Sequence, residues 1–144
     1  MANPNRPTLS HVSLTVTNLE KAISWYESVF NVQLQMEEAF PGGRQVVLAD
    51  PEWKLMIVLS RHDANQGEPF AESRTGMDHA GFLVDSRAEL VAWQAQLADN
   101  GVARAAAADR PLTQSPIEDH SYASLLTFRD PDNIQLHFMA MPSQ

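Results

Sequence analysis

Two stretches of the sequence decide the fold, because they repeat one another: "SHVSLTVTNLEKAISWY" (residues 10–26) and "DHAGFLVDSRAELVAWQ" (residues 78–94). At one constant offset of 68 residues, three pairs align: His11 with His79, Val16 with Val84, and Trp25 with Trp93. Each stretch first alternates apolar and polar residues, as a strand does, and then changes to the spacing of an amphipathic helix. The chain is therefore predicted to contain two copies of one strand–helix unit.

The predicted helices have start and stop signals. Thr17-x-x-Glu20 and Ser86-x-x-Glu89 have the pattern of capping boxes, and Asn100-Gly101 is a helix end. The spacing predicts buried faces made of Leu19, Ala22, Ile23, Tyr26 and Phe30 in the first helix and of Leu90, Val91 and Leu97 in the second. Trp25 and Trp93 are predicted to pack in the core of each unit.

Three strand-like segments follow each helix, at roughly 32–38, 44–50 and 54–60 and again at roughly 102–107, 123–129 and 134–141. The last hairpins match through "DPEWKLMIV" and "DPDNIQLHF". The predicted fold class is α+β, built from two βαβββ modules. One module is near the lower size limit for independent folding, so we expect a single domain over residues 1–144. Its parts are module one (about 8–60), a polar linker (61–76) and module two (about 77–141).

Composition excludes several classes of function. The formal net charge is −8 and the ten basic residues are scattered, which argues against a nucleic-acid partner. The chain has no cysteine, which excludes disulfides, thiolate metal sites and cysteine nucleophiles. The polar N-terminus and the lack of a long apolar run indicate neither a secretion signal nor a membrane span. We expect a cytoplasmic protein that does not bind a membrane.

Three histidines share one predicted feature, which is the face of the strand on which they lie. Residues i and i+2 of a strand share a face, so His11, His79 and His137 are all predicted to lie on the face away from the helices. On a flat, solvated sheet they would be ordinary surface residues. On a curved sheet they would line a cavity, and three imidazoles with open positions suit zinc and also Fe, Ni or Cu.

The pattern resembles the vicinal oxygen chelate superfamily, which groups glyoxalase I, bleomycin-resistance proteins, fosfomycin-resistance enzymes and type I extradiol dioxygenases. The resemblance rests on the strand-opening histidines and on the last hairpin, Asp130-Pro131-Asp132-x-x-x-Leu136. It implies two βαβββ modules that form a cupped mixed sheet around a central cavity, with the helices on the outside. It also implies a small-molecule substrate, dioxygenase, lyase or isomerase chemistry, and a homodimer.

The resemblance further implies a divalent metal ion, which could be Fe, Zn, Mn, Ni or Co. By position, His11 and His79 match two histidine ligands, and His137 stands where the family usually has a glutamate. A third imidazole leaves the full 2+ charge on the metal, and it weakens the dioxygenase interpretation, because those enzymes use two histidines and one carboxylate. In the first module, the Asp-Pro alignment sets Ile57 opposite His137, so no fourth ligand is expected there.

Two further residues are candidates for proton transfer. His120 and Tyr122 lie in "PIEDHSYAS", just before a predicted strand, and a histidine at a cavity mouth suits acid–base catalysis near neutral pH. The alternative is an exposed loop. For the whole chain, two other functions stay open: a metal-free protein of the bleomycin-resistance type that sequesters a small molecule or antibiotic, and a structural or regulatory module.

Overall fold

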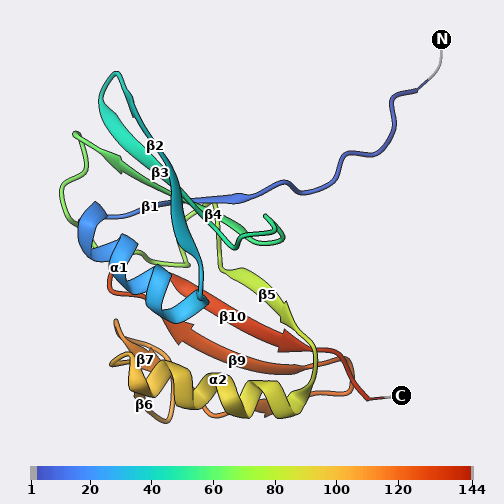
Figure 1. Ribbon diagram of the computed structural model, residues 1–144. Coiled ribbons are helices and arrows are strands. Elements are labelled where there is room, and N and C mark those ends of the chain that lie inside the picture. The colour runs from blue at the N-terminus through green and yellow to red at the C-terminus, as the bar shows by residue number, and fades with distance from the viewer. Residues whose placement is uncertain (1–2, 144) are drawn as a thin grey trace. The chain divides into compact units, whose positions relative to one another are not determined.

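The computed structural model describes residues 3–143, shown as a ribbon in Figure 1. The chain divides into two compact units, Met1–Ala64 (unit 1) and Asn65–Gln144 (unit 2), and each is described by itself. Each unit has one mixed sheet and one helix, which confirms the predicted α+β class and the two βαβββ modules. Neither helix of the described residues has the length and apolar character needed to cross a membrane.

Unit 1 is a regular βαβββ module. Its elements are β1 (Val12–Thr15), α1 (Leu19–Phe30), β2 (Gln33–Phe40), β3 (Gly43–Ala49) and β4 (Met56–His62). The strand order is β1-β4-β3-β2, with β1 parallel to β4 and the other pairs antiparallel. The parallel pair follows from the helix, which carries the chain from β1 across to the other strands.

Helix α1 begins one residue later than its capping pattern predicts. The N-cap is Asn18, whose side-chain Oδ1 accepts a hydrogen bond from the Lys21 backbone N–H at 3.0 Å. The predicted Thr17–Glu20 capping box is therefore wrong, and the Glu20 carboxylate pairs with the Arg44 guanidinium of β3 instead. The buried face otherwise follows the prediction, since Leu19, Ala22, Tyr26 and Phe30 are buried and Ile23 is partly exposed.

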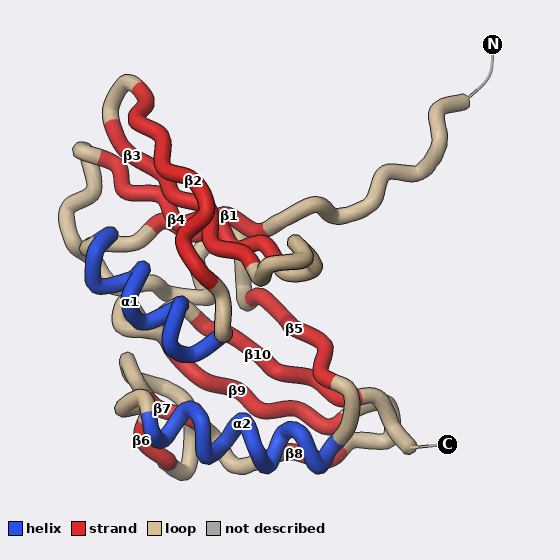
Figure 2. The backbone as a smooth tube through the Cα atoms, in the orientation of Figure 1, coloured by secondary structure: helices blue, strands red, loops and turns tan. Residues whose placement is uncertain are grey.

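Unit 2 keeps the same plan, and apart from the first strand of each unit its strands are shorter than those of unit 1. Its elements are β5 (Ala80–Val84), α2 (Arg87–Asp99), β6 (Ala103–Arg104), β7 (Thr113–Gln114), β8 (Glu118–Asp119), β9 (Ser124–Arg129) and β10 (Gln135–Ala140). The order is β5-β10-β9-β7-β6, with β8 also paired to β9. Figure 2 shows α2 beside the long β9–β10 pair.

The strand predicted over residues 102–107 is only two residues long, and the structure forms β7 and β8 where no strand was predicted. Pro111 and Pro116 lie in this stretch. Proline has no N–H to donate to a sheet, so it divides the pairing into short pieces. One regular strand of unit 1 is thus replaced in unit 2 by three fragments.

The second helix confirms most of its predicted features. The Ser86 hydroxyl accepts from the Glu89 backbone N–H at 3.2 Å, and Gly101 has a positive φ of 81° just after the helix. Val91 is 49% exposed, so its predicted burial is wrong. The Trp93 ring stacks on Phe138 at 4.5 Å between centroids, which confirms its packing role.

The predicted linker is not free along its length. The Phe70 N–H donates to the Asp132 carbonyl at 2.9 Å, and the Asn133 side chain donates to the Phe70 carbonyl at 3.2 Å. The Glu72 carboxylate accepts two hydrogen bonds from the Arg129 guanidinium, both at 2.9 Å. This part of the linker is therefore attached to the β9–β10 hairpin of unit 2.

The last hairpins of the two units have the same kind of turn, opened by an aspartate, but the turns differ in length by one residue. In unit 1 the Asp50 carboxylate accepts from the Leu55 N–H at 2.7 Å, five residues later. In unit 2 the equivalent Asp130 carboxylate accepts from the Ile134 N–H at 2.8 Å, four residues later. The first hairpin therefore contains one extra residue, which changes the register of everything after it.

Candidate functional site: a histidine pair in unit 2

The structure brings two of the predicted site residues together. His79 directly precedes β5, and His137 lies in β10, the strand that pairs with β5 in parallel. Their rings stack with centroids 4.0 Å apart and planes only 17° apart. Strand pairing thus places the two imidazoles side by side within one unit, as the shared strand face predicts.

The environment of His137 keeps its ring uncharged. Burial, and secondarily the neighbouring His79, lowers the pKa of His137 from 6.5 to about 4. The carboxylates of Asp78 and Glu118 act in the opposite direction but do not reverse the shift. At neutral pH the ring of His137 is a neutral imidazole, which is the form that binds metal ions.

Each strand-opening histidine has a partner on the residue before it. The Asp78 carboxylate lies 2.8 Å from Nδ1 of His79, and the Ser10 hydroxyl lies 3.0 Å from Nδ1 of His11. An ionised carboxylate only accepts hydrogen bonds, so Nδ1 of His79 carries the proton. In the neutral form of this ring, Nε2 of His79 has the free lone pair.

The set of three histidines stays a prediction. His11 belongs to unit 1, whereas His79 and His137 belong to unit 2. Within either unit, residues 3–143 contain no group of three or more His, Asp or Glu side chains placed to hold a metal ion. The structure therefore assembles one pair of candidate ligands from a single unit.

The register corrects the predicted counterpart of His137. The repeat-equivalent residues Val12 and Ala80 pair with Ile57 and Leu136, respectively. Ile57 thus corresponds to Leu136, and Val58 corresponds to His137. The Asp-Pro alignment was wrong by one position because of the extra residue in the first hairpin. Val58 is apolar, so the expectation that unit 1 supplies no ligand at this position is unchanged.

His120 and Tyr122 also come together, at the turn between β8 and β9. Their rings stack at 5.1 Å with planes 11° apart, and His120 Nε2 lies 3.3 Å from a Glu118 carboxylate oxygen. The turn is anchored by Asp119, which accepts two hydrogen bonds from the Arg87 guanidinium of α2. Tyr122 is 62% exposed. Their catalytic role stays a prediction.

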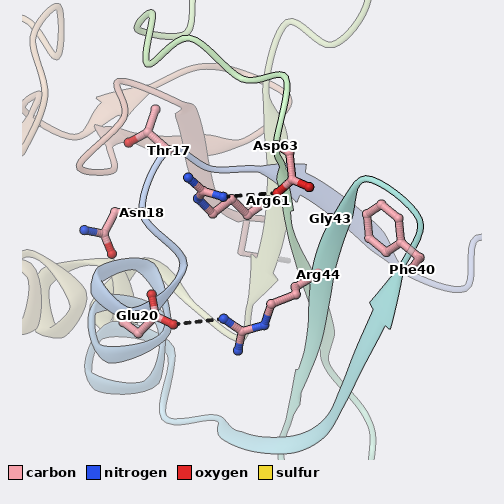
Figure 3. Close-up of a pocket in the computed structure, with 8 residues that line it drawn as sticks. All are labelled: Thr17, Asn18, Glu20, Phe40, Gly43, Arg44, Arg61 and Asp63. Atoms are coloured by element: carbon pink, nitrogen blue, oxygen red, sulfur yellow. Dashed lines mark hydrogen bonds and ion pairs between the residues drawn. The ribbon is translucent and has the colours of Figure 1, made fainter.

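A separate cavity lies wholly within unit 1, with a volume of about 580 Å³ (Figure 3). Figure 3 shows Arg44 directed at Glu20 and Arg61 directed at Asp63. Each guanidinium group is paired with a carboxylate that also lines the cavity. The positive and negative charges of these four residues therefore balance, which leaves no net charge to select an ion. Its other lining residues are Thr17, Asn18, Phe40 and Gly43.

Sequence reasoning missed the residues that surround the histidine pair. Gln135 donates from its amide nitrogen to the Asp78 carboxylate at 3.0 Å and to the Asp78 carbonyl at 3.2 Å. Gln135 shares a strand face with His137, and Asp78 precedes His79, but the contact between Gln135 and Asp78 depends on the pairing of β5 with β10. The buried Arg129 gave no such signal, because its partners are distant in sequence.

Comparison with known proteins decides the family. The model of the Glyoxalase/Bleomycin resistance protein/Dioxygenase superfamily matches residues 8–138. The chain belongs to this superfamily. Its members typically bind small molecules and often form dimers, and the fold predicted from the resemblance is that of the family.

Individual members of the superfamily resemble the chain to different degrees. A glyoxalase/bleomycin resistance protein/dioxygenase domain from Frankia sp. EAN1pec has a TM-score of 0.82 and 30% identity, over 96% of this chain and 100% of that one. The fosfomycin resistance protein FosX from Listeria monocytogenes, solved with Mn(II) and sulfate, has a TM-score of 0.62 and 17% identity, over 96% of this chain and 95% of FosX.

A curated relative adds a named activity. The trivalent organoarsenical cleaving enzyme of Bacillus sp. (strain MD1) is 32% identical over 93 residues. The match covers 65% of this chain and 51% of that enzyme, so this chain aligns with only about half the length of its relative.

Proposed function

We propose that the protein is a divalent-metal-dependent enzyme of the vicinal oxygen chelate type that acts on a small oxygenated organic molecule. The observation that carries the proposal is the stacked pair of His79 and His137, at 4.0 Å. Paired strands bring these two imidazoles together, and the resemblance to the family implies metal ligands at both positions. His11, the repeat equivalent of His79, is proposed as the third ligand.

The donor chemistry fits a divalent metal. His137 is neutral at neutral pH because its pKa is lowered to about 4, and the proton of His79 is on Nδ1. The neutral ring of His137 offers a lone pair without first losing a proton, and the neutral tautomer of His79 offers one at Nε2. Imidazole ligands suit Zn, Fe, Ni and Cu, and the related FosX was solved with Mn(II). When bound, such an ion supplies Lewis acidity toward a substrate oxygen.

The turn between β8 and β9 supplies the groups proposed for proton transfer. His120 would move a proton to or from the substrate, since its ring nitrogen already has the Glu118 carboxylate at 3.3 Å. Tyr122 stacks on this ring and would fix its orientation. Asp119 holds the turn to α2 through the Arg87 guanidinium and orients the Ser124 hydroxyl at 2.6 Å.

The absence of cysteine bears on the proposed substrate class. The curated relative cleaves trivalent organoarsenicals, but this chain has no cysteine and thus no thiolate with which to hold a soft As(III) centre. The resemblance to the superfamily implies a metal that chelates neighbouring oxygen atoms of the substrate. We therefore propose an oxygenated organic substrate and do not carry the arsenical over.

Metal analysis of protein purified without a histidine tag tests this function. We expect roughly one equivalent of divalent metal per chain, and its loss in His11→Ala, His79→Ala and His137→Ala. His62→Ala is the matched control, because the His62 ring packs against Phe40 at the end of β4 and is not a proposed ligand, and this variant should keep the metal. A wild-type protein that takes up no metal under saturating conditions would overturn the proposal and favour metal-free binding of a small molecule.

We also propose that the protein is a homodimer, from the small size of each module and from the frequency of dimers in the family. Sedimentation velocity at micromolar concentration should give twice the 16.0 kDa mass of the chain. A single 16.0 kDa species would contradict this expectation.

A further inference from the structure

We propose that Asp78 and Gln135 are positioning residues for His79: they hold the tautomer in which Nδ1 carries the proton, so that Nε2 remains free to bind a ligand. This inference rests on the proposed function, because it gives a purpose to the orientation of a proposed metal ligand. It concerns residues that neither the family match nor the sequence pattern assigns.

Asp78 contacts the ring of His79, the next residue in the chain. Asp78 Oδ1 lies 2.8 Å from His79 Nδ1, which is within the range of a strong, charge-assisted hydrogen bond. Because the carboxylate only accepts, the bond specifies the tautomer as well as the rotation of the ring. Outer carboxylates commonly orient histidine ligands of metals in this way.

Gln135 holds the Asp78 side chain in place. The Asp78 side chain is 66% exposed, so without a partner it would rotate in solvent. The Gln135 amide nitrogen donates both to Asp78 Oδ1, at 3.0 Å, and to the Asp78 carbonyl, at 3.2 Å. Two contacts to one residue fix the carboxylate relative to its own backbone. Gln135 lies in β10 two residues before His137, so one strand carries both a proposed ligand and the support of the other.

Arg129 fixes the orientation of the Gln135 amide. An amide can rotate so that its oxygen and nitrogen exchange places, and only one of the two orientations donates to Asp78. The Arg129 guanidinium donates to the Gln135 amide oxygen at 3.4 Å, which places the amide nitrogen on the side of Asp78. Arginine has no acceptor, so the reversed amide would set two donors against each other.

Arg129 is in turn held rigidly. Its side chain is only 5% exposed, and it also donates to the Ala108 carbonyl at 2.7 Å and to the Asn133 carbonyl at 3.2 Å. The Glu72 carboxylate completes the set with two bonds of 2.9 Å. The chain of contacts therefore runs from the linker through Arg129, Gln135 and Asp78 to the ring of His79.

The repeat provides an internal comparison. His11 has the Ser10 hydroxyl 3.0 Å from its Nδ1, in the position that Asp78 occupies beside His79. A hydroxyl both donates and accepts, so Ser10 is compatible with either tautomer of His11. Only unit 2 has the carboxylate and the amide that specify one tautomer.

Stability does not account for these contacts. An ion pair or hydrogen bond between exposed groups contributes little to folding, typically below about 1 kcal/mol. The Asp78 and His79 side chains are 66% and 41% exposed. If Asp78 has a structural role, its removal should lower the thermal stability. If it has a positioning role, its removal should change the His79 tautomer and the metal affinity instead.

The experiment compares Asp78→Asn and Gln135→Leu with wild type, with Asp109→Asn as the matched control. Asp109 is an exposed aspartate of the same unit that only pairs with Arg110, at 3.5 Å. The first measurement is the ¹⁵N NMR spectrum of the histidine rings in metal-free protein, which reports the tautomer directly. We expect predominantly Nδ1–H at His79 in wild type and in Asp109→Asn, and a mixture of tautomers in the other two variants.

The second measurement is divalent-metal affinity by competition with a chromophoric chelator. Loss of an outer partner of a metal ligand typically weakens binding about 10–100-fold, and we expect this for both test variants but not for the control. Thermal midpoints should stay within about 2 °C of wild type, since Asp78 is exposed and Gln135 is only partly buried. Asp78→Glu should restore much of the affinity, because it keeps a carboxylate.

The outcomes separate this inference from the proposed function. If wild type binds no metal, the proposed function fails, while the tautomer shift in metal-free protein still supports or contradicts the positioning role. If wild type binds metal but neither test variant changes the His79 tautomer, the positioning role is overturned and the function stands. A tautomer change with an equal loss of thermal stability in both variants would also overturn it, in favour of a structural role.

Discussion

The last strands of the two units differ at one position that matters for chemistry. Both hairpins open with the same Asp-Pro turn, in which the aspartate accepts hydrogen bonds from the following backbone. At the equivalent position that follows, β4 has Val58 and β10 has His137. Unit 1 therefore uses this strand face for packing, with Val58 only 6% exposed, whereas unit 2 uses it for a histidine pair.

The last strands of the two units also differ in the core residue that follows this position. Unit 2 has an aromatic cluster in which Phe138 packs against Phe128, Trp93 and Phe82. The equivalent residue of unit 1 is Leu59, which is fully buried in a sheet of longer, regular strands. Unit 1 has its own aromatic cluster, but it lies on α1, where Trp25, Tyr26 and Phe30 pack together. Unit 2 therefore places an aromatic core residue on its last strand, whereas unit 1 has an aliphatic residue there.

Truncation of the two equivalent residues, Phe138 and Leu59, should have the largest effects. Phe138→Ala should cost about 3–5 kcal/mol in the free energy of unfolding, and Leu59→Ala about 2–5 kcal/mol, because each leaves a cavity in a buried sheet face. We expect Phe138→Ala to be the more damaging, since three rings lose their contact. Urea denaturation followed by circular dichroism measures both, and a larger loss for Leu59→Ala would refute the difference between the cores.

A smaller effect tests the attachment of the linker to unit 2. Glu72→Gln should destabilise the protein by about 1–3 kcal/mol near neutral pH, because it weakens charged hydrogen bonds to the buried Arg129. Hydrogen bonding to Arg129 lowers the pKa of Glu72 from 4.5 to about 2. The native state thus keeps this carboxylate charged where the unfolded chain binds a proton, so its contribution is full above pH 4.5 and is lost as the pH falls toward 2.

The matching control for the acid range is Asp119→Asn. Its carboxylate also has a pKa of about 2, caused first by the hydrogen bonds from Arg87, but both side chains of that pair are about half exposed. Chemical denaturation between pH 2 and 6 gives the slope of the free energy of unfolding against pH. Glu72→Gln should reduce this slope clearly more than Asp119→Asn does. Equal slopes for the two variants would mean that the linker contact adds nothing beyond a surface pair.

The smallest expected effect concerns the helix starts. Asn18→Ala and Ser86→Ala should each cost about 1 kcal/mol, because each removes the side-chain acceptor for a backbone N–H of the first turn. Thr17→Ala should cost less than Asn18→Ala. Thermal unfolding of the three variants measures the order, and a larger loss for Thr17→Ala would restore the capping box that the sequence pattern predicted.

The repeat made most of the fold predictable, since a pattern seen twice at one offset is hard to produce by chance. The helices, the hairpin turns and the shared strand face of the histidines all depend on local spacing. The Asp50 turn was different, because a one-residue insertion leaves the sequence motif intact while it moves every later side chain to the other face. Sequence alignment paired Ile57 with His137 for that reason, and only the hydrogen-bond register identifies Val58.

The surroundings of the site were less predictable than its histidines. Arg129 lies in an apolar strand and contacts Glu72, 57 residues earlier in the chain. Nothing local indicates such a contact, because it depends on how the linker returns to the hairpin. The support of His79 through Gln135 was likewise missed, since it joins side chains that are adjacent only after the parallel pairing of β5 and β10.

The attached linker changes where this chain can be divided. Asp63 is still hydrogen-bonded to Gly42 of unit 1, and Phe70 is already bonded to Asp132 of unit 2, so residues 64–69 are the stretch between these two attachments. A pair of fragments for complementation, or new termini for a circular permutant, belongs within this stretch. A division at Gly76, the end of the apolar-poor segment, would instead separate Glu72 from Arg129 and leave a buried cation without its carboxylate.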